Sequence, residues 1–119
     1  MDSPTTKLLK DLRKRLEPLG FPIHFKLPDA SAAEPFLVVG GIISDTSKTA
    51  QTGLIIEDST VQIDIFLPGS KSRAYAENIK SQAVRLLGHS ARMTSSILMD
   101  NSIGREVYHI VIKTTETIL

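Results

Sequence analysis

The segment that decides the fold is residues 60–67, Thr-Val-Gln-Ile-Asp-Ile-Phe-Leu, in which every second side chain is aliphatic. This period of two is typical of a β-strand with one face against a core. The core-facing set is Val61, Ile63, Ile65 and Leu67, and the opposite set is Gln62, Asp64 and Phe66. The strand should end at Pro68 and Gly69, because proline cannot extend a ladder of hydrogen bonds.

A second strand is expected upstream, at residues 36–43, which read Phe-Leu-Val-Val-Gly-Gly-Ile-Ile. The run is rich in β-branched residues and follows Pro35, which is tolerated as a first strand residue. We expect it to be buried on both faces, with a bulge or close backbone approach at Gly40 and Gly41. The polar residues 44–53 between the two strands are expected to form a loop or hairpin excursion.

Two amphipathic helices are expected at residues 4–17 and 71–87. Ser3 and Pro4 form a favoured start for the first helix, and either Ser70 or Ser72 can cap the second. Gly88 is suited to end the second helix. The basic residues of the first helix, which we interpret as a solvated outer face over a leucine stripe, are Lys7, Lys10, Arg13, Lys14 and Arg15.

The remaining segments complete a single α+β domain over residues 1–119. Residues 93–99 and 105–117 are expected to form a closing β-hairpin, and residues 21–27 a short strand or extended arm. The resulting order is α-β-β-α-β-β. It predicts a mostly antiparallel sheet with two helices packed on one face.

Composition excludes several classes of protein. The 119 residues include no cysteine, which excludes a disulfide scaffold, a thiolate zinc site and a cysteine nucleophile. The 14 basic side chains balance 13 acidic ones, whereas general polyanion binders are usually strongly basic. No apolar run is long enough for a secretory signal or a membrane span, so a protein without a membrane partner is expected.

Two sequence motifs approach known sites but depart from them. Residues 69–72, Gly-Ser-Lys-Ser, resemble the end of a phosphate-binding loop, yet the upstream glycine is missing and the spacing is wrong. Residues 88–92, Gly-His-Ser-Ala-Arg, resemble a nucleophile elbow but lack its final glycine. We therefore interpret the first motif as a helix cap and the second as a turn that ends a helix.

The titratable residues also suggest no catalytic site. The three histidines, His24, His89 and His109, lie far apart in the sequence, without the spacing of metal ligands. Asp58 and Asp64 lie six residues apart, or about 20 Å along an extended strand. A partner lysine or arginine is expected for this acidic region. No catalytic, cofactor-binding or metal-binding residue is predicted, no small-molecule substrate is expected, and the chain is not expected to be an enzyme.

Taken in order, the segments resemble the tail-terminator, or tail-completion, proteins of long-tailed, non-contractile phages, the group of the lambda minor tail protein U. The similarity covers nearly the whole chain. The matching features are the first helix ending in Leu19-Gly20, the strand opening at residues 35–39, the strand at residues 61–66, the helix containing residues 74–79 and the final strand at residues 108–112.

The resemblance implies a structural protein that forms a ring, hexameric in this family. Such a ring caps the head-proximal end of the tail tube, stops tube polymerisation and offers the head-tail joining surface. The implied partners are the tail tube protein and a head completion or connector protein. The implied location is the host cytoplasm during assembly and then the virion.

A head-to-tail ring needs two different complementary patches on each subunit. We expect charged sheet-edge and loop residues to supply them, namely Asp45, Lys48, Asp58 and Arg105. Two alternatives stay open: another head-tail connector or tail component of related fold, and a small nucleic-acid or regulatory binding domain that uses the basic first helix.

Overall fold

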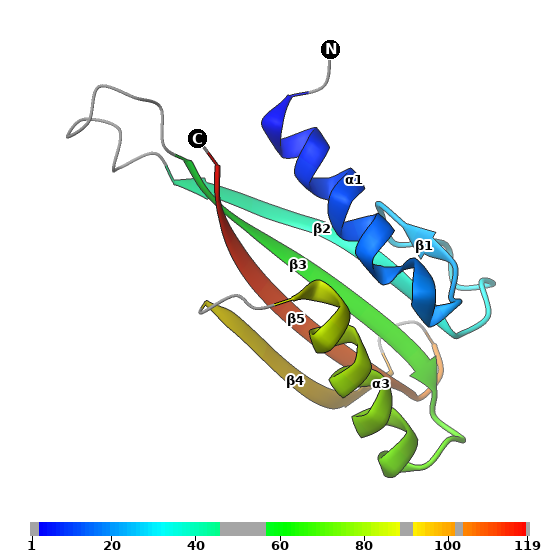
Figure 1. Cartoon of the computed structure of the whole chain (residues 1–119). Coiled ribbons are helices and arrows are strands. Elements are labelled where there is room, and N and C mark those ends of the chain that lie inside the picture. Colours follow the sequence, from blue (N-terminus) through cyan, green and yellow to red (C-terminus); the bar gives the residue numbers. More distant parts are fainter. Residues whose placement is uncertain (1–2, 46–56, 89–91, 102–103, 119) are drawn as a thin grey trace, which may run out of the picture.

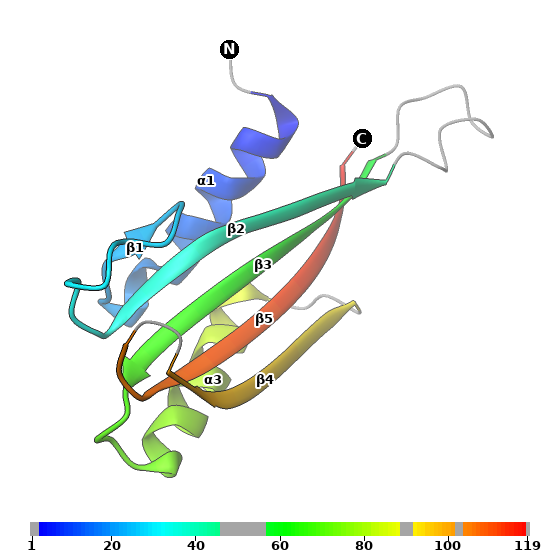
Figure 2. The same cartoon turned by 180° about the vertical axis from the view of Figure 1, so that it is seen from behind.

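The computed structural model of the chain describes residues 3–45, 57–88, 92–101 and 104–118. Its elements are α1 (Pro4–Leu16), the 3-10 helix η1 (Glu17–Leu19), β1 (Ile23–His24), β2 (Phe36–Asp45), β3 (Glu57–Pro68), α3 (Arg73–Leu87), β4 (Met93–Asp100) and β5 (Val107–Ile118). The strands form one sheet in the order β1-β2-β3-β5-β4. Both helices lie on the same face of the sheet (Figure 1), and Figure 2 shows the other face, which no helix covers.

The α+β class and the placement of two helices on one face are confirmed, but the sheet is mixed rather than wholly antiparallel. The pairs β2–β3, β3–β5 and β4–β5 are antiparallel, whereas β1 runs parallel to β2. The segment expected as a short strand or arm thus joins the sheet as an additional edge strand, and the order becomes α-β-β-β-α-β-β. The chain turns after η1, where Gly20 adopts a φ of 79°. The segment that follows this turn lies beside β2 and runs parallel to it.

The alternation at residues 60–67 determines which side of β3 is buried. Val61, Ile63 and Ile65 are fully buried, and they pack with Leu12 and Leu16 of α1 in one apolar core. This core also includes residues of α3, β2 and β5, namely Ala76, Ala83, Leu87, Leu37, Val39, Ile110 and Ile112. The predicted core face of the central strand is therefore confirmed.

Local signals also fix the element boundaries. The Ser3 and Ser72 hydroxyls accept hydrogen bonds from the backbone N–H groups of Thr6 and Tyr75, both at 3.1 Å. Ser72, rather than Ser70, therefore caps α3, and the phosphate-loop-like segment is a helix cap as expected. The register of β2 against β3 shifts between Gly40 and Ile43, which is the predicted bulge.

Candidate functional site

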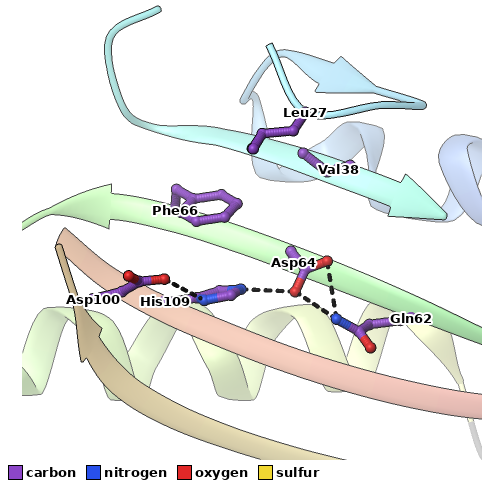
Figure 3. Close-up of a pocket in the computed structure, with 7 residues that line it drawn as sticks. All are labelled: Leu27, Val38, Gln62, Asp64, Phe66, Asp100 and His109. Carbon is purple, nitrogen blue, oxygen red and sulfur yellow. Dashed lines mark hydrogen bonds and ion pairs between the residues drawn. The ribbon is translucent and has the colours of Figure 1, made fainter. Parts of the chain in front are cut away.

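The face of the sheet opposite the helices carries a hollow of about 260 Å³ (Figure 3). Its described lining residues are Leu27, Val38, Gln62, Asp64, Phe66, Asp100 and His109. All of them except Leu27 belong to strands of the sheet. They share one face because alternate side chains of a strand point to opposite faces. Gln62, Asp64 and Phe66 alternate along β3 with its buried aliphatic side chains, and they therefore lie on this face.

His109 is the centre of the hollow and is held between two carboxylates. Its Nε2 atom lies 2.7 Å from Asp64 Oδ1, and its Nδ1 atom lies 3.1 Å from Asp100 Oδ2. The three side chains come from β5, β3 and the last residue of β4, and each is less than one-fifth exposed. We call this arrangement the Asp64–His109–Asp100 bridge, since it ties three strands together.

The hydrogen bonds favour the charged form of His109. An ionised carboxylate only accepts hydrogen bonds, so both ring nitrogens donate when the imidazole is doubly protonated. Desolvation, the largest single influence, lowers the pKa of His109, but the hydrogen bonds and charges of Asp64 and then Asp100 outweigh it. The net effect raises the pKa above the ordinary histidine value. The bridge then carries one positive and two negative charges.

Aromatic stacking positions the His109 ring. The ring stacks on Phe66 at a centroid separation of 4.4 Å, and Phe66 stacks on Phe36 at 5.0 Å. His24 meets Phe36 edge to face at 5.9 Å. Phe36, Phe66 and His109 are direct neighbours in the register of β2, β3 and β5. One row of rings therefore crosses the sheet and orients the imidazole toward the two carboxylates.

The geometry of the bridge is unlike that of a histidine base. A general base needs a free ring nitrogen near the group that it deprotonates, whereas both nitrogens of His109 are bonded to carboxylates. Asp64 also accepts from Gln62 Nε2 at 3.0 and 3.2 Å. Within the described ranges, no group of histidine, cysteine, aspartate and glutamate side chains is arranged to hold a metal ion. The bridge is suited to joining strands and carrying charge.

The four residues expected at an interface have different positions. Asp45 and Asp58 stand opposite each other in the β2–β3 register, at one end of the sheet. Lys48 lies outside the described residues. Arg105 lies at the opposite end, two residues before Val107, which is the first residue of β5 and pairs with Pro68 of β3. The structure thus brings together the two aspartates and separates them from the arginine.

Arg105 fastens the connection between β1 and β2. Its guanidinium forms an ion pair with Glu34, whose side chain is only 7% exposed. The same group donates to the backbone carbonyls of Ala30 and Ala32. Val107 and Phe36, which lie two residues after Arg105 and Glu34, belong to a second small cluster of buried residues with Val38 and Phe66.

We expect Arg105→Ala to lower the melting temperature, because it removes the cation beside a nearly buried carboxylate and leaves two carbonyls without a donor. The matched control is Arg73→Ala, which removes an exposed ion pair with Glu77 on α3 and should have a much smaller effect. Thermal unfolding of both variants measures the difference. Equal melting temperatures for the two variants would contradict this role for Arg105.

The bridge could be foreseen only in part. The alternation patterns place Asp64 and His109 each on one side of its own strand, but they give no indication that these strands are neighbours. The expected lysine or arginine partner of Asp64 proves to be His109, helped by Gln62. His89 lies outside the described residues, as does most of the elbow-like segment.

Comparisons with known proteins identify no relative: no family model matches the chain, and a search of curated proteins found no match. Within the described residues, no helix is long and apolar enough to cross a membrane.

Proposed function

We propose that the chain is a structural subunit that associates head to tail into a ring and caps the head-proximal end of a phage tail tube. The ring, hexameric in the family that the sequence resembles, stops tube growth and presents the surface that joins the head. Its partners are the tail tube protein and a head completion or connector protein. It assembles in the host cytoplasm and ends in the virion. No catalytic step is part of this proposal.

The observation that carries the proposal is the presence of two unlike charged surfaces on one subunit. Lys7, Arg13 and Lys14 are exposed on α1, whereas two aspartates, Asp45 and Asp58, occupy paired positions at one end of the sheet. Like charges placed directly opposite each other on neighbouring strands destabilise an isolated sheet. A cationic surface from a second subunit would relieve that repulsion, and such unlike patches are what heterologous association requires.

The character of the uncovered sheet face argues against nucleic-acid binding on the sheet itself. Single-stranded RNA and DNA bind by stacking their bases on exposed aromatic rings beside a basic groove. Here Phe36 and Phe66 are only 3% and 5% exposed, and the neighbouring His109 is bonded to Asp64 and Asp100. The two rings therefore form no exposed stacking platform.

The proposal predicts that Asp58→Lys weakens ring formation and leaves the fold intact. The concentration for half-assembly should rise at least about tenfold, which corresponds to about 1.4 kcal/mol. Glu106→Lys is the matched control, because it makes the same change of charge at an exposed position next to the other end of β3. Light scattering and native mass spectrometry measure the assembly, and far-ultraviolet circular dichroism checks the fold.

Electron microscopy tests the location of the ring. Tail tubes that lack their terminator should continue to grow without the protein and should acquire a cap at one end when it is added. A chain that stays monomeric at every concentration and never joins tubes would reject the proposal. Binding along the tube, or only to the head connector, would identify another tail or connector component.

A further inference from the structure

Strand β4 forms an open edge of the sheet. It stands last in the order β1-β2-β3-β5-β4, and in the described part of the chain no strand pairs with its outer side. Its register with β5 runs without interruption from Met93 to Asp100, so no bulge twists the edge away. Alternate residues of such a strand direct their N–H and C=O groups outward, where another strand can pair with them.

The sequence of β4 lacks the usual protection of an edge. Its eight residues, Met-Thr-Ser-Ser-Ile-Leu-Met-Asp, contain no lysine and no proline. Its only charge is Asp100, which is bonded to His109. Leu98 and Met99 are each 43% exposed, which is unusual for large apolar side chains. Proteins normally blunt an exposed edge with charge, proline or a bulge, so β4 has the properties of a strand that acquires a partner.

A second free edge lies on the other side of the same sheet. β1 pairs with β2 only at Leu37 and Val38. The backbone of residue 25 remains near β2 at Gly40, where a Cβ atom would lie 3.6 Å from the Phe25 carbonyl oxygen. Beyond it, Gly41 and Ile42 lie in the bulge, and residues 43–45 of β2 pair with β3 on one side. Within the described residues, no strand pairs with the other side of residues 41–45.

We propose that β4 of one subunit pairs with residues 41–45 of β2 in a second copy of the chain. This inference rests on the proposed ring. Pairing β4 with β2 joins the sheets of neighbouring subunits and leaves only the two-residue strand β1 outside the closed ring, whereas a two-fold β4–β4 pair would leave the β2 edge open in both subunits. The sheet thereby continues from subunit to subunit.

Strand directions are compatible with this pairing. Three successive antiparallel pairs connect β2 to β4, so these two strands run in opposite directions within one subunit. A rotation about an axis roughly along the strands preserves those directions. β4 therefore meets the neighbouring β2 in an antiparallel arrangement, and all helices remain on the same side of the continuous sheet.

The two edges are offset along the strands, which predicts a tilt. Ser96 in the middle of β4 is level with Asp64 of β3, through Val111, whereas Ile43 is level with Thr60. The offset of four residues along β3 is about 13 Å, across the four strands β2, β3, β5 and β4, which are about 19 Å wide in total. The strands would tilt about 34° from the ring axis, which is close to the tilt typical of closed sheets.

Cysteine pairing tests the interface directly, because the natural chain has no cysteine. A Ser44→Cys protein is mixed with a Ser95→Cys or a Ser96→Cys protein at a concentration that supports rings, and the mixture is then oxidised. Opposite residues on antiparallel strands lie within the Cα separation of a disulfide. Ser95 and Ser96 point to opposite faces, so one of the two is suited to the register.

The proposal expects linked dimers only when both kinds of variant are present. A protein that carries both substitutions should give a ladder of linked species up to the complete ring. In the control mixtures, a Ser81→Cys protein takes the place of either the Ser44→Cys protein or the β4 variant. Ser81 is exposed on α3. Linkage of Ser96→Cys to itself, independent of Ser44→Cys, would show a β4–β4 pair and overturn the proposal. Linkage no greater than with Ser81→Cys would also overturn it.

The same variants separate this inference from the proposed function. Rings that cap tail tubes but give no linkage between residue 44 and β4 would overturn only the strand pairing. Linked rings that do not cap tubes would overturn only the tail-terminator function and would leave the pairing in place.

Discussion

His109→Gln should lower the free energy of unfolding by about 2 kcal/mol at about pH 6, because hydrogen bonds to charged groups contribute about 1.5–3 kcal/mol each and this site is partly exposed. Glutamine carries no charge and cannot donate to Asp64 and Asp100 from two opposite ring atoms. The substitution leaves two carboxylates close together without the cation between them. Chemical denaturation of the two proteins measures the difference.

The effect of this substitution should depend on pH. The folded protein raises the pKa of His109 above its value in the unfolded chain. The stabilisation is therefore complete below the unfolded value of about 6.5 and is lost as the pH rises through the higher folded value. We expect the natural protein to lose stability as the pH rises above about 6.5, and the variant to lose much less.

His24→Gln is the matched control for this titration, because His24 contacts Phe36 at its ring edge and has no described bond to the two bridging carboxylates. It should keep the slope of the natural protein. A natural protein that becomes more stable over this range, or an unchanged slope in His109→Gln, would contradict the charged bridge.

Gly69→Ala adds one methyl group and should lower the free energy of unfolding by about 3 kcal/mol. A Cβ atom at Gly69 would lie 2.3 Å from the carbonyl oxygen of Glu106 and 3.0 Å from its carbonyl carbon. Both atoms belong to the backbone, so no side-chain rotation can relieve the clash. The turn after β3 would have to move away from the start of β5, and with it Arg105 and the small cluster around Val107.

Gly20→Ala provides the comparison for this clash. Gly20 has a φ of 79°, and a Cβ atom there would meet nothing within 4 Å. Its replacement should cost about 1–2 kcal/mol from backbone conformation alone. Urea unfolding curves compare the two variants, and a smaller loss for Gly69→Ala than for Gly20→Ala would refute the close approach. Gly69 is thus required by packing against Glu106.

Short-range patterns predict most of the individual elements. The starts of both helices follow from Ser3 with Pro4 and from Ser72, since each serine satisfies a free backbone N–H. The alternation of β3 predicts its buried face, and the glycine pair predicts the bulge in β2. These features depend on neighbours within a few residues, so they can be predicted from the sequence.

The arrangement of the strands was predicted less well. The connection after η1 could lead to a strand or an arm, and the short parallel pairing of β1 depends on where β2 lies. The edge position of β4 likewise depends on β5 occupying the place beside β3. Strand order is a property of the whole sheet, because several orders bury the same apolar faces.

Local sequence patterns are enough to predict an α+β chain with two amphipathic helices and a central strand with one apolar face. The contacts of Asp64 with His109, 45 positions away, and of Glu34 with Arg105, 71 positions away, arise only when the chain folds. Periodicity specifies which face a side chain occupies, because it repeats within one strand. The partner on that face depends on strand order and register, which are set when distant segments pack on a common core.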